Sequence, residues 1–245
     1  MRRIERPSSN HDARPLGAAI DMLVLHYTGM PTAEGALERL CDPAAKVSAH
    51  YTVDRDGTVY AHVAEERRAW HAGASFWAGR AQLNDVSIGI ELVNPGHEFG
   101  YIPFTDDQIA ALTDLARQIL SRHAIPAARV LGHSDVAPAR KTDPGELFPW
   151  RRLAAAGIGL WPASPAPCGK AAPAPSSARV RADRAGDDAD AIAGALSKFG
   201  YGVPPRVDVP LKDVIAAFQR HYRAAKIDGL WDGECAALLN DLSSP

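Results

Sequence analysis

Two histidines in this sequence each end a short apolar run, which is a position suited to holding a metal ion. The run Asp21–Leu25 precedes His26, and Val130–Gly132 precedes His133. A histidine at the end of a buried strand is held rigidly while its ring faces a cleft, as a metal site requires. For either residue taken singly, the alternative is a core histidine whose ring is hydrogen-bonded inside the protein.

An aspartate could complete such a site. Asp143 follows His133 by ten positions and comes two residues after Lys141. Zinc hydrolases use two or three nitrogen ligands, often with one carboxylate, and leave a fourth position open for water. His26, His133 and Asp143 could therefore supply three ligands to one Zn²⁺. Lys141 would face the same spot or, in the alternative interpretation, simply cover surface.

A further acid–base candidate lies on the predicted strand Val86–Val93. Alternate residues of a strand share a face, so Gly89 and Glu91 lie on the side opposite Ile88 and Ile90. Because Gly89 has no side chain, Glu91 can face a cleft with room for a ligand. The alternative is a solvated glutamate at the edge of a sheet.

The elements that must position these residues follow from hydrophobic periodicity and turn signals. Asp56 and Gly57 predict a hairpin turn, and Thr105 with Gln108 predicts a capping box that begins a long helix. We expect an irregular segment over residues 1–18. Strands separated by helices, with one hairpin, predict an α/β fold in which helices flank a mixed central sheet. The predicted strands are Met22–Leu25, Ser48–Val53, Val59–Val63, Val86–Val93 and Val130–Leu131, and the predicted helices here are Glu34–Cys41 and Thr105–His123.

The composition is ordinary for a globular protein, with 46% apolar and 23% charged residues among 245. The formal net charge of −2 gives no reason to expect nucleic acid or an anionic membrane as a partner. Cys41, Cys168 and Cys235 form no CxxC pair, so they predict neither a cysteine-ligated metal nor a disulfide framework. We expect no membrane span and no secretory signal in the sequence as written. The compartment stays open between cell envelope and cytoplasm.

The composition changes after residue 162. Residues 163–186 are rich in Pro, Ala, Ser and Arg, which predicts an extended, semi-rigid linker. Residues 187–245 carry apolar side chains at helical spacing, which predicts helices Asp188–Phe199, Leu211–Arg223 and Gly233–Leu242. We therefore expect a catalytic domain over 1–162, a linker over 163–186 and a small three-helix domain over 187–245.

Six motifs, in order, carry a resemblance to a known family. They are Leu25–Thr28, Ser48–Tyr51, Trp70–Gly73, Leu83–Glu91, Gly132–Asp135 and Lys141–Gly145. Together they resemble the motifs of the zinc-dependent N-acetylmuramoyl-L-alanine amidases, and the bacterial branch that handles muropeptides and anhydro-muropeptides is the most similar. The resemblance covers about residues 15–162 and implies the amidase fold, a mixed sheet covered by helices.

The resemblance implies a role for each residue of the candidate site. His26, His133 and Asp143 would bind one Zn²⁺, with water in the fourth position. Glu91 would act as base toward that water and then as acid toward the departing amine. Lys141 would stabilise the oxyanion of the tetrahedral intermediate.

Four further residues match substrate-contacting positions of the family: His50, Trp70, His71 and Asn84. In distant branches, the phage lysozyme-like and the recognition-protein-like, a catalytic tyrosine precedes the residue equivalent to His50. Here that position is Ala49, so Glu91 is the better candidate base, and we expect His50 to line the cleft rather than bind metal. Trp70 could present a flat apolar face to the sugar or stem peptide, or it could be a buried structural residue.

The C-terminal segment resembles the three-helix peptidoglycan-binding module of wall hydrolases at Phe199–Tyr201, Ala217–Arg220 and Ile227–Gly229. The alternative is a helical domain that binds nothing. The leading function is a monomeric amidase that cuts between N-acetylmuramic acid and L-alanine in peptidoglycan or muropeptides. The alternatives are a non-catalytic peptidoglycan receptor, which typically lacks a ligand such as Asp143, and a cytoplasmic recycling amidase restricted to anhydro-muropeptides.

Overall fold

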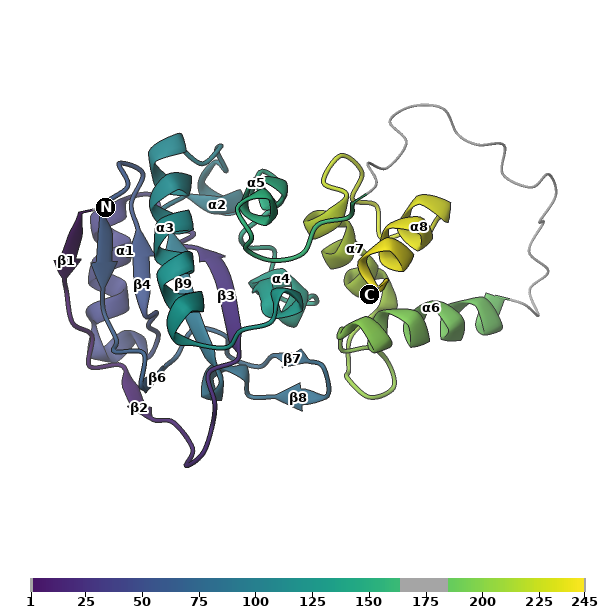
Figure 1. Cartoon of the computed structure of the whole chain (residues 1–245), viewed down its shortest axis with the longest axis horizontal. Helices are drawn as coiled ribbons and strands as arrows, with labels where there is room; N and C mark the ends of the chain where they lie inside the picture. The colour runs from purple at the N-terminus through teal and green to yellow at the C-terminus, as the bar shows by residue number, and fades with distance from the viewer. Residues whose placement is uncertain (1, 164–184, 245) are drawn as a thin grey trace.

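The protein folds around a six-stranded mixed sheet, shown in the computed structural model of Figure 1. The structure describes residues 2–163 and 185–244. Neighbouring strands of this sheet are parallel except for β4 and β5, which form the predicted hairpin. In spatial order the strands are β1 (Arg3–Glu5), β5 (Val59–Ala61), β4 (Tyr51–Val53), β9 (Ser87–Leu92), β3 (Met22–Tyr27) and β10 (Val130–Gly132). The predicted mixed central sheet is therefore confirmed.

One face of the sheet packs against the long helix α3 (Asp106–Arg122), which stands in front of it in Figure 1. Alternation along β3 and β9 directs apolar side chains to this face. The helix begins as the sequence predicts, because Oγ1 of Thr105 accepts a hydrogen bond from the backbone N–H of Gln108. The buried side chains include Leu23, Leu25, Ile88 and Ile90 from the strands and Ile109, Leu112, Leu115 and Ile119 from α3.

The apolar side chains on the opposite face of the sheet belong to a second cluster. This cluster also includes side chains of the short helix α4 (His133–Val136) and of α6 (Ala185–Phe199), α7 (Leu211–Tyr222) and α8 (Gly233–Leu242). Figure 1 shows these last three helices grouped beside α4, at the end of the molecule away from β1. Their apolar side chains form one continuous cluster with Met22 and Val24 of β3 and with Leu131 and Val136. The helices over residues 185–244, hereafter the C-terminal module, thus share a hydrophobic core with the sheet.

The remaining elements are short. Two small antiparallel pairs join β2 (His11–Ala13) to β6 (Arg67–Ala69) and β7 (Phe76–Trp77) to β8 (Arg80–Ala81). The other helices are α1 (Ala33–Cys41), α2 (Gly96–Phe99) and α5 (Trp150–Ala155), with 3₁₀ turns at Pro43–Ala45, Leu83–Asp85 and Ala127–Arg129. No helix of the described residues is long and apolar enough to cross a membrane.

The expectation of an irregular segment over residues 1–18 was wrong, because β1 and β2 lie within it. Each is only three residues long, too short for an alternating pattern to register in the sequence. Cys168 and all but the ends of the predicted linker lie outside the described residues. The domain boundaries at 162 and 187 stay a prediction.

Candidate metal site and cleft

Strand pairing brings His26 and Glu91 together. Strands β3 and β9 are parallel neighbours in which His26 is paired with Glu91, and Val24 with Gly89. Paired residues of adjacent strands project from the same face. Strand β10 pairs with β3 on its other side, and His133 follows its last residue directly. Three neighbouring strands therefore deliver two imidazoles and a carboxylate to one end of the sheet.

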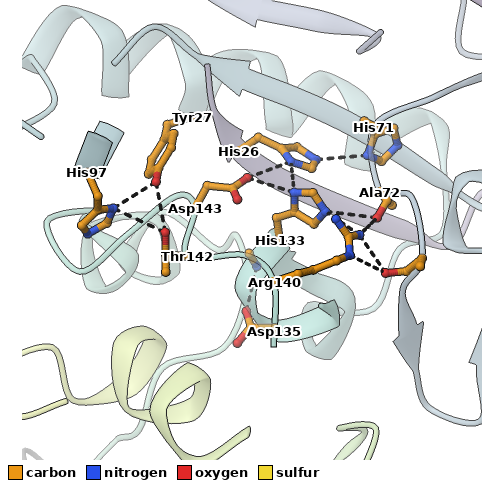
Figure 2. A network of polar contacts seen from close by, with 12 residues as sticks. His26, Tyr27, His71, Ala72, His97, His133, Asp135, Arg140, Thr142 and Asp143 are labelled. Carbon is orange, nitrogen blue, oxygen red and sulfur yellow. Dashed lines mark hydrogen bonds and ion pairs between the residues drawn. The ribbon is translucent and has the colours of Figure 1, made fainter. Parts of the chain in front are cut away.

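His26, His133 and Asp143 converge on one point, as Figure 2 shows. The two Nδ1 atoms lie 2.9 Å apart, and Oδ2 of Asp143 lies 3.0 Å from Nδ1 of His26 and 3.1 Å from Nδ1 of His133. All three residues are buried. The structure thus brings together the three residues that the sequence selects as metal ligands.

A chain of hydrogen bonds fixes the tautomer of His26. The hydroxyl of Ser87 donates to the carbonyl of Leu83 at 2.7 Å, so its oxygen accepts from Nε2 of His71 at 3.1 Å. Nδ1 of His71 then carries no proton and accepts from Nε2 of His26 at 3.0 Å. Burial, and next the neighbouring histidines, lower the pKa of His71 well below its usual value, so its ring is neutral. Nδ1 of His26 is left with a free lone pair.

A backbone carbonyl does the same for His133. Its Nε2 lies 3.1 Å from the carbonyl oxygen of Ala72, which can only accept, so the proton is on Nε2 and the lone pair on Nδ1. Arg140 donates to the same carbonyl. A backbone carbonyl that accepts from the far ring nitrogen, as here, is typical of metal-binding histidines.

The three converging atoms are all acceptors. Burial, and then His133, lower the pKa of His26 to about 4, so this ring is neutral near pH 7. Two lone pairs and a carboxylate oxygen at such separations repel one another unless a cation lies between them.

The donor set and its spacing fit Zn²⁺. Tetrahedral ligands about 2.0–2.1 Å from zinc lie roughly 3.3 Å from one another. The observed separations of 2.9–3.1 Å need to open by only a few tenths of an ångström. Two neutral imidazoles, each oriented from behind, and one carboxylate also match a hydrolytic zinc site with an open fourth position.

Gly89 makes room for the ring of His71. A Cβ built on Gly89 would lie 2.4 Å from Cγ of His71, far inside van der Waals contact. The sequence predicts that Gly89 leaves space on this face of β9, and in the structure His71 occupies that space. Both ring nitrogens of His71 are hydrogen-bonded within the protein, to His26 and Ser87.

The segment that carries Asp143 is held from two sides. Its backbone carbonyl accepts from the N–H of Ser134 at 2.9 Å. Next to it, the hydroxyl of Tyr27 contacts Thr142 at 3.1 Å and His97 at 2.9 Å (Figure 2). The other ring nitrogen of His97 contacts Glu146. Sequence reasoning missed His97, because only the fold places α2 beside this segment.

Glu91, Lys141, Trp70 and His71 line a cleft of about 370 Å³ together with the three converging residues. Oε2 of Glu91 is buried and has no hydrogen-bond partner among the described residues. Burial, and then the negative charge of Asp143, raise the pKa of Glu91 well above its usual value, while Lys141 opposes the rise. A carboxyl group that has a raised pKa and an oxygen without a hydrogen-bond partner, in a cleft beside a metal site, is suited to exchanging a proton with a bound molecule.

His50 and Asn84 lie away from this cleft. His50 is completely buried; its Nδ1 accepts from the backbone N–H of Gly89 at 3.0 Å, and its Nε2 lies 3.0 Å from Arg14. We expected His50 to line the cleft, but the cleft-lining residues do not include it. The side-chain oxygen of Asn84 accepts from the backbone of His71 at 3.2 Å and of Ala72 at 2.8 Å. Asn84 thereby supports the segment that orients both metal-site histidines.

The sequence profile of one family, described as N-acetylmuramoyl-L-alanine amidase, matches residues 16–146 of this chain. The chain belongs to the N-acetylmuramoyl-L-alanine amidase family. The matched range contains the three converging residues, Glu91 and Lys141. The sequence resemblance and the amidase fold are therefore confirmed.

Three members of the amidase family illustrate how far the likeness extends. AmiD of Escherichia coli K12 is 37% identical over 242 residues, which cover 91% of this chain and 82% of AmiD. A structure of AmiD with the substrate anhydro-N-acetylmuramic acid-L-Ala-D-γ-Glu-L-Lys superposes with a TM-score of 0.75 at 35% identity, covering 94% of this chain and 91% of that one. AmpDh3 of Pseudomonas aeruginosa, in complex with anhydromuramic pentapeptide, also gives 0.75, with 34% identity and coverage of 93% and 92%. AmpD of Enterobacter cloacae, a 1,6-anhydro-N-acetylmuramyl-L-alanine amidase, is 37% identical but covers only 60% of this chain and 86% of itself.

Proposed function

We propose that this protein is a zinc-dependent amidase that hydrolyses the bond between the lactyl group of N-acetylmuramic acid and the L-alanine of the stem peptide. One observation carries the proposal: three buried acceptor atoms converge within 3.1 Å of one another at the base of a cleft. The relatives with anhydromuramic peptides bound support the 1,6-anhydro sugar as one accepted form of the substrate.

Zn²⁺ is the ion that we propose for this site, held by Nδ1 of His26, Nδ1 of His133 and Oδ2 of Asp143. When bound, it would polarise the scissile carbonyl and lower the pKa of a coordinated water toward about 7. The protein orients the two histidine ligands in advance, through His71 behind His26 and through Ala72 behind His133. This preorganisation keeps the ordering cost of metal binding small.

Glu91 is the proposed proton carrier. It lies in register with His26 on the neighbouring strand, lines the cleft, and has an oxygen with no partner among the described residues. It would take a proton from the attacking water and give it to the departing nitrogen of L-alanine. A cation beside Asp143 would offset part of the rise in the pKa of Glu91 and bring it closer to neutral pH, where a group can serve in both directions.

Lys141 and Trp70 are the proposed substrate contacts at the rim. Lys141 lines the cleft two residues before Asp143, where its ammonium would stabilise negative charge on the carbonyl oxygen of the tetrahedral intermediate. Trp70 is partly exposed in the same cleft and would offer its flat face to the sugar or the peptide stem. For His71, Asn84 and His50 we propose supporting roles, because their polar side-chain atoms contact the protein itself.

One experiment tests the amidase against both alternatives. The zinc-loaded protein is incubated with intact sacculi and, separately, with soluble anhydro-muropeptides, and released peptides are identified by mass spectrometry. Glu91→Gln, which keeps the three ligands, is the matched control. We expect free stem peptides beginning with L-alanine from both substrates, and none from the control.

The other outcomes point elsewhere. Release from the soluble substrate alone would favour a recycling amidase, and sacculus binding without release from either substrate would favour a receptor.

We also propose that the C-terminal module binds peptidoglycan and that the protein acts as a monomer. Co-sedimentation with sacculi and light scattering of the purified protein test these two points.

A further inference from the structure

Asp135 lies two residues after the proposed zinc ligand His133, at the junction between α4 and the C-terminal module. Its carboxylate is 1% exposed and accepts three hydrogen bonds. One comes from the backbone N–H of Gly132 at 2.7 Å, within the same segment. The other two come from the C-terminal module: Tyr201 donates its hydroxyl to Oδ1 at 2.7 Å, and Nδ1 of His221 donates to Oδ2 at 2.7 Å.

The two donors from the module are themselves held rigidly. Tyr201 is 1% exposed, and its ring packs against Trp77 at 4.8 Å between centroids. His221 stacks between two rings, that of Trp150 at 3.7 Å and that of Tyr222 at 4.0 Å. Buried charge-assisted hydrogen bonds of this length are among the stronger polar contacts in proteins. The contact is therefore a fixed attachment between module and catalytic part.

The segment attached in this way has little stability of its own. Helix α4 has four residues, a single turn, and an isolated turn of helix is unstable without tertiary contacts. It carries the proposed ligand His133 as its first residue, and the N–H of Ser134 donates to the carbonyl of Asp143 at 2.9 Å. Whatever fixes α4 therefore fixes His133 directly and Asp143 through its backbone.

We propose that the C-terminal module is a positioning element of the metal site, in which Tyr201 and His221 hold Asp135 so that α4 presents His133 and the backbone of Asp143 in register with His26. This inference rests on the proposed function, in that the ion concerned is zinc. The inference goes beyond the proposed function because the module acts on the metal site itself, in addition to binding peptidoglycan. Leu131 and Val136, on either side of the ligand segment, pack into the same apolar cluster as the module and reinforce the attachment.

Conservative substitutions in the full-length protein test this inference. Tyr201→Phe removes one hydroxyl and keeps the buried ring. Asp135→Asn keeps the shape but replaces one accepting oxygen with an amide that donates. Gln219→Met is the matched control, because Gln219 lies on α7 with His221 and its hydrogen-bond partners, Asp228, Gly229, Leu230 and Cys235, all belong to the module.

The probes are zinc and cobalt ions, without any substrate. Zinc affinity is measured by competition with a chromophoric chelator, ligand geometry by the visible spectrum of the Co²⁺-loaded protein, and folding by thermal denaturation. We expect Tyr201→Phe and Asp135→Asn each to weaken zinc binding by about tenfold, within the range seen when outer partners of metal ligands are removed, and to shift the Co²⁺ spectrum. Gln219→Met should lower the melting temperature and leave zinc affinity and the spectrum unchanged.

Two results would overturn the inference. One is zinc affinity within twofold of the wild type in both Tyr201→Phe and Asp135→Asn. The other is an equal loss of affinity in Gln219→Met, which would mean that general destabilisation of the module is responsible. A wild-type protein that binds no zinc would instead refute the proposed function, so the two failures are distinguishable.

Discussion

Substitution of Gly89 by alanine tests whether His71 orients His26, a proposed zinc ligand. The added Cβ would lie 2.4 Å from Cγ of His71 and 2.6 Å from its Nδ1 and Cδ2. Carbon atoms in contact are normally about 3.5 Å apart or more, so the ring must move by about 1 Å. Its hydrogen bonds to His26 and Ser87, at 3.0 and 3.1 Å, would then exceed hydrogen-bond length.

The expected consequence is a loss of metal affinity. Removing the outer partner of a metal-ligating histidine typically costs about 10–100-fold in affinity, which corresponds to about 1.4–2.7 kcal/mol. Overpacking adds a destabilisation of roughly 1–3 kcal/mol to the folded protein. Gly89→Ala should therefore bind zinc at least tenfold more weakly and melt at a lower temperature, both with and without the ion.

The assay is zinc titration against a chromophoric chelator, paired with thermal denaturation. Gly194→Ala is the matched control, since Gly194 is exposed on α6 and a Cβ there would contact nothing within 4 Å. Ser87→Ala is a second variant, which removes the hydroxyl behind His71 without adding bulk. Zinc affinity of Gly89→Ala within twofold of the wild type would refute the argument that His71 orients His26.

Three further predictions follow from named contacts. Asp143→Ala should lower the bound zinc well below one ion per chain, measured by metal analysis after dialysis; full retention would remove Asp143 from the ligand set. Glu91→Gln should retain zinc but lose about 10²–10⁴-fold in turnover of anhydro-muropeptide, and unchanged turnover would exclude it as the proton carrier. The third concerns Glu65: burial would raise its pKa, but hydrogen bonds from Arg122, His123 and a tyrosine outweigh burial and hold the pKa at about 2. Because this pKa is depressed on folding, the stabilisation is fully present above about pH 4.5 and is lost as the pH falls toward 2. The melting temperature of metal-free Glu65→Gln should therefore fall less than that of the wild type as the pH is lowered over that range. Parallel plots of melting temperature against pH for the two proteins would contradict the depressed pKa of Glu65.

The strand-end histidines were predictable because their signal is local. Continuous apolar runs before His26 and His133 identify buried strands, and the long helix that covers one sheet face is marked by its cap at Thr105 and its periodicity. The sequence indicated free space at Gly89 but assigned it to a ligand, whereas in the structure the ring of His71 fills it.

The support behind the ligands was not predictable. The order of the strands places Val24 opposite Gly89, and only that register puts His71 behind His26. His71 resembles a substrate-contacting residue in the sequence, while its hydrogen bonds depend on a serine in the next motif. The attachment of Asp135 to His221 joins residues 86 positions apart, on elements that carry no pairing signal in the sequence.

The apolar cluster that β3 shares with α6, α7 and α8 limits how this protein can be engineered. Met22, Val24 and Leu131 are almost completely buried, and side chains of the C-terminal module belong to the same cluster. The module therefore cannot be exchanged freely. A chimera that replaces it with a different domain after residue 163 would expose to water the apolar face of this cluster that the module covers. We expect such hybrids to aggregate unless that face is redesigned with polar side chains.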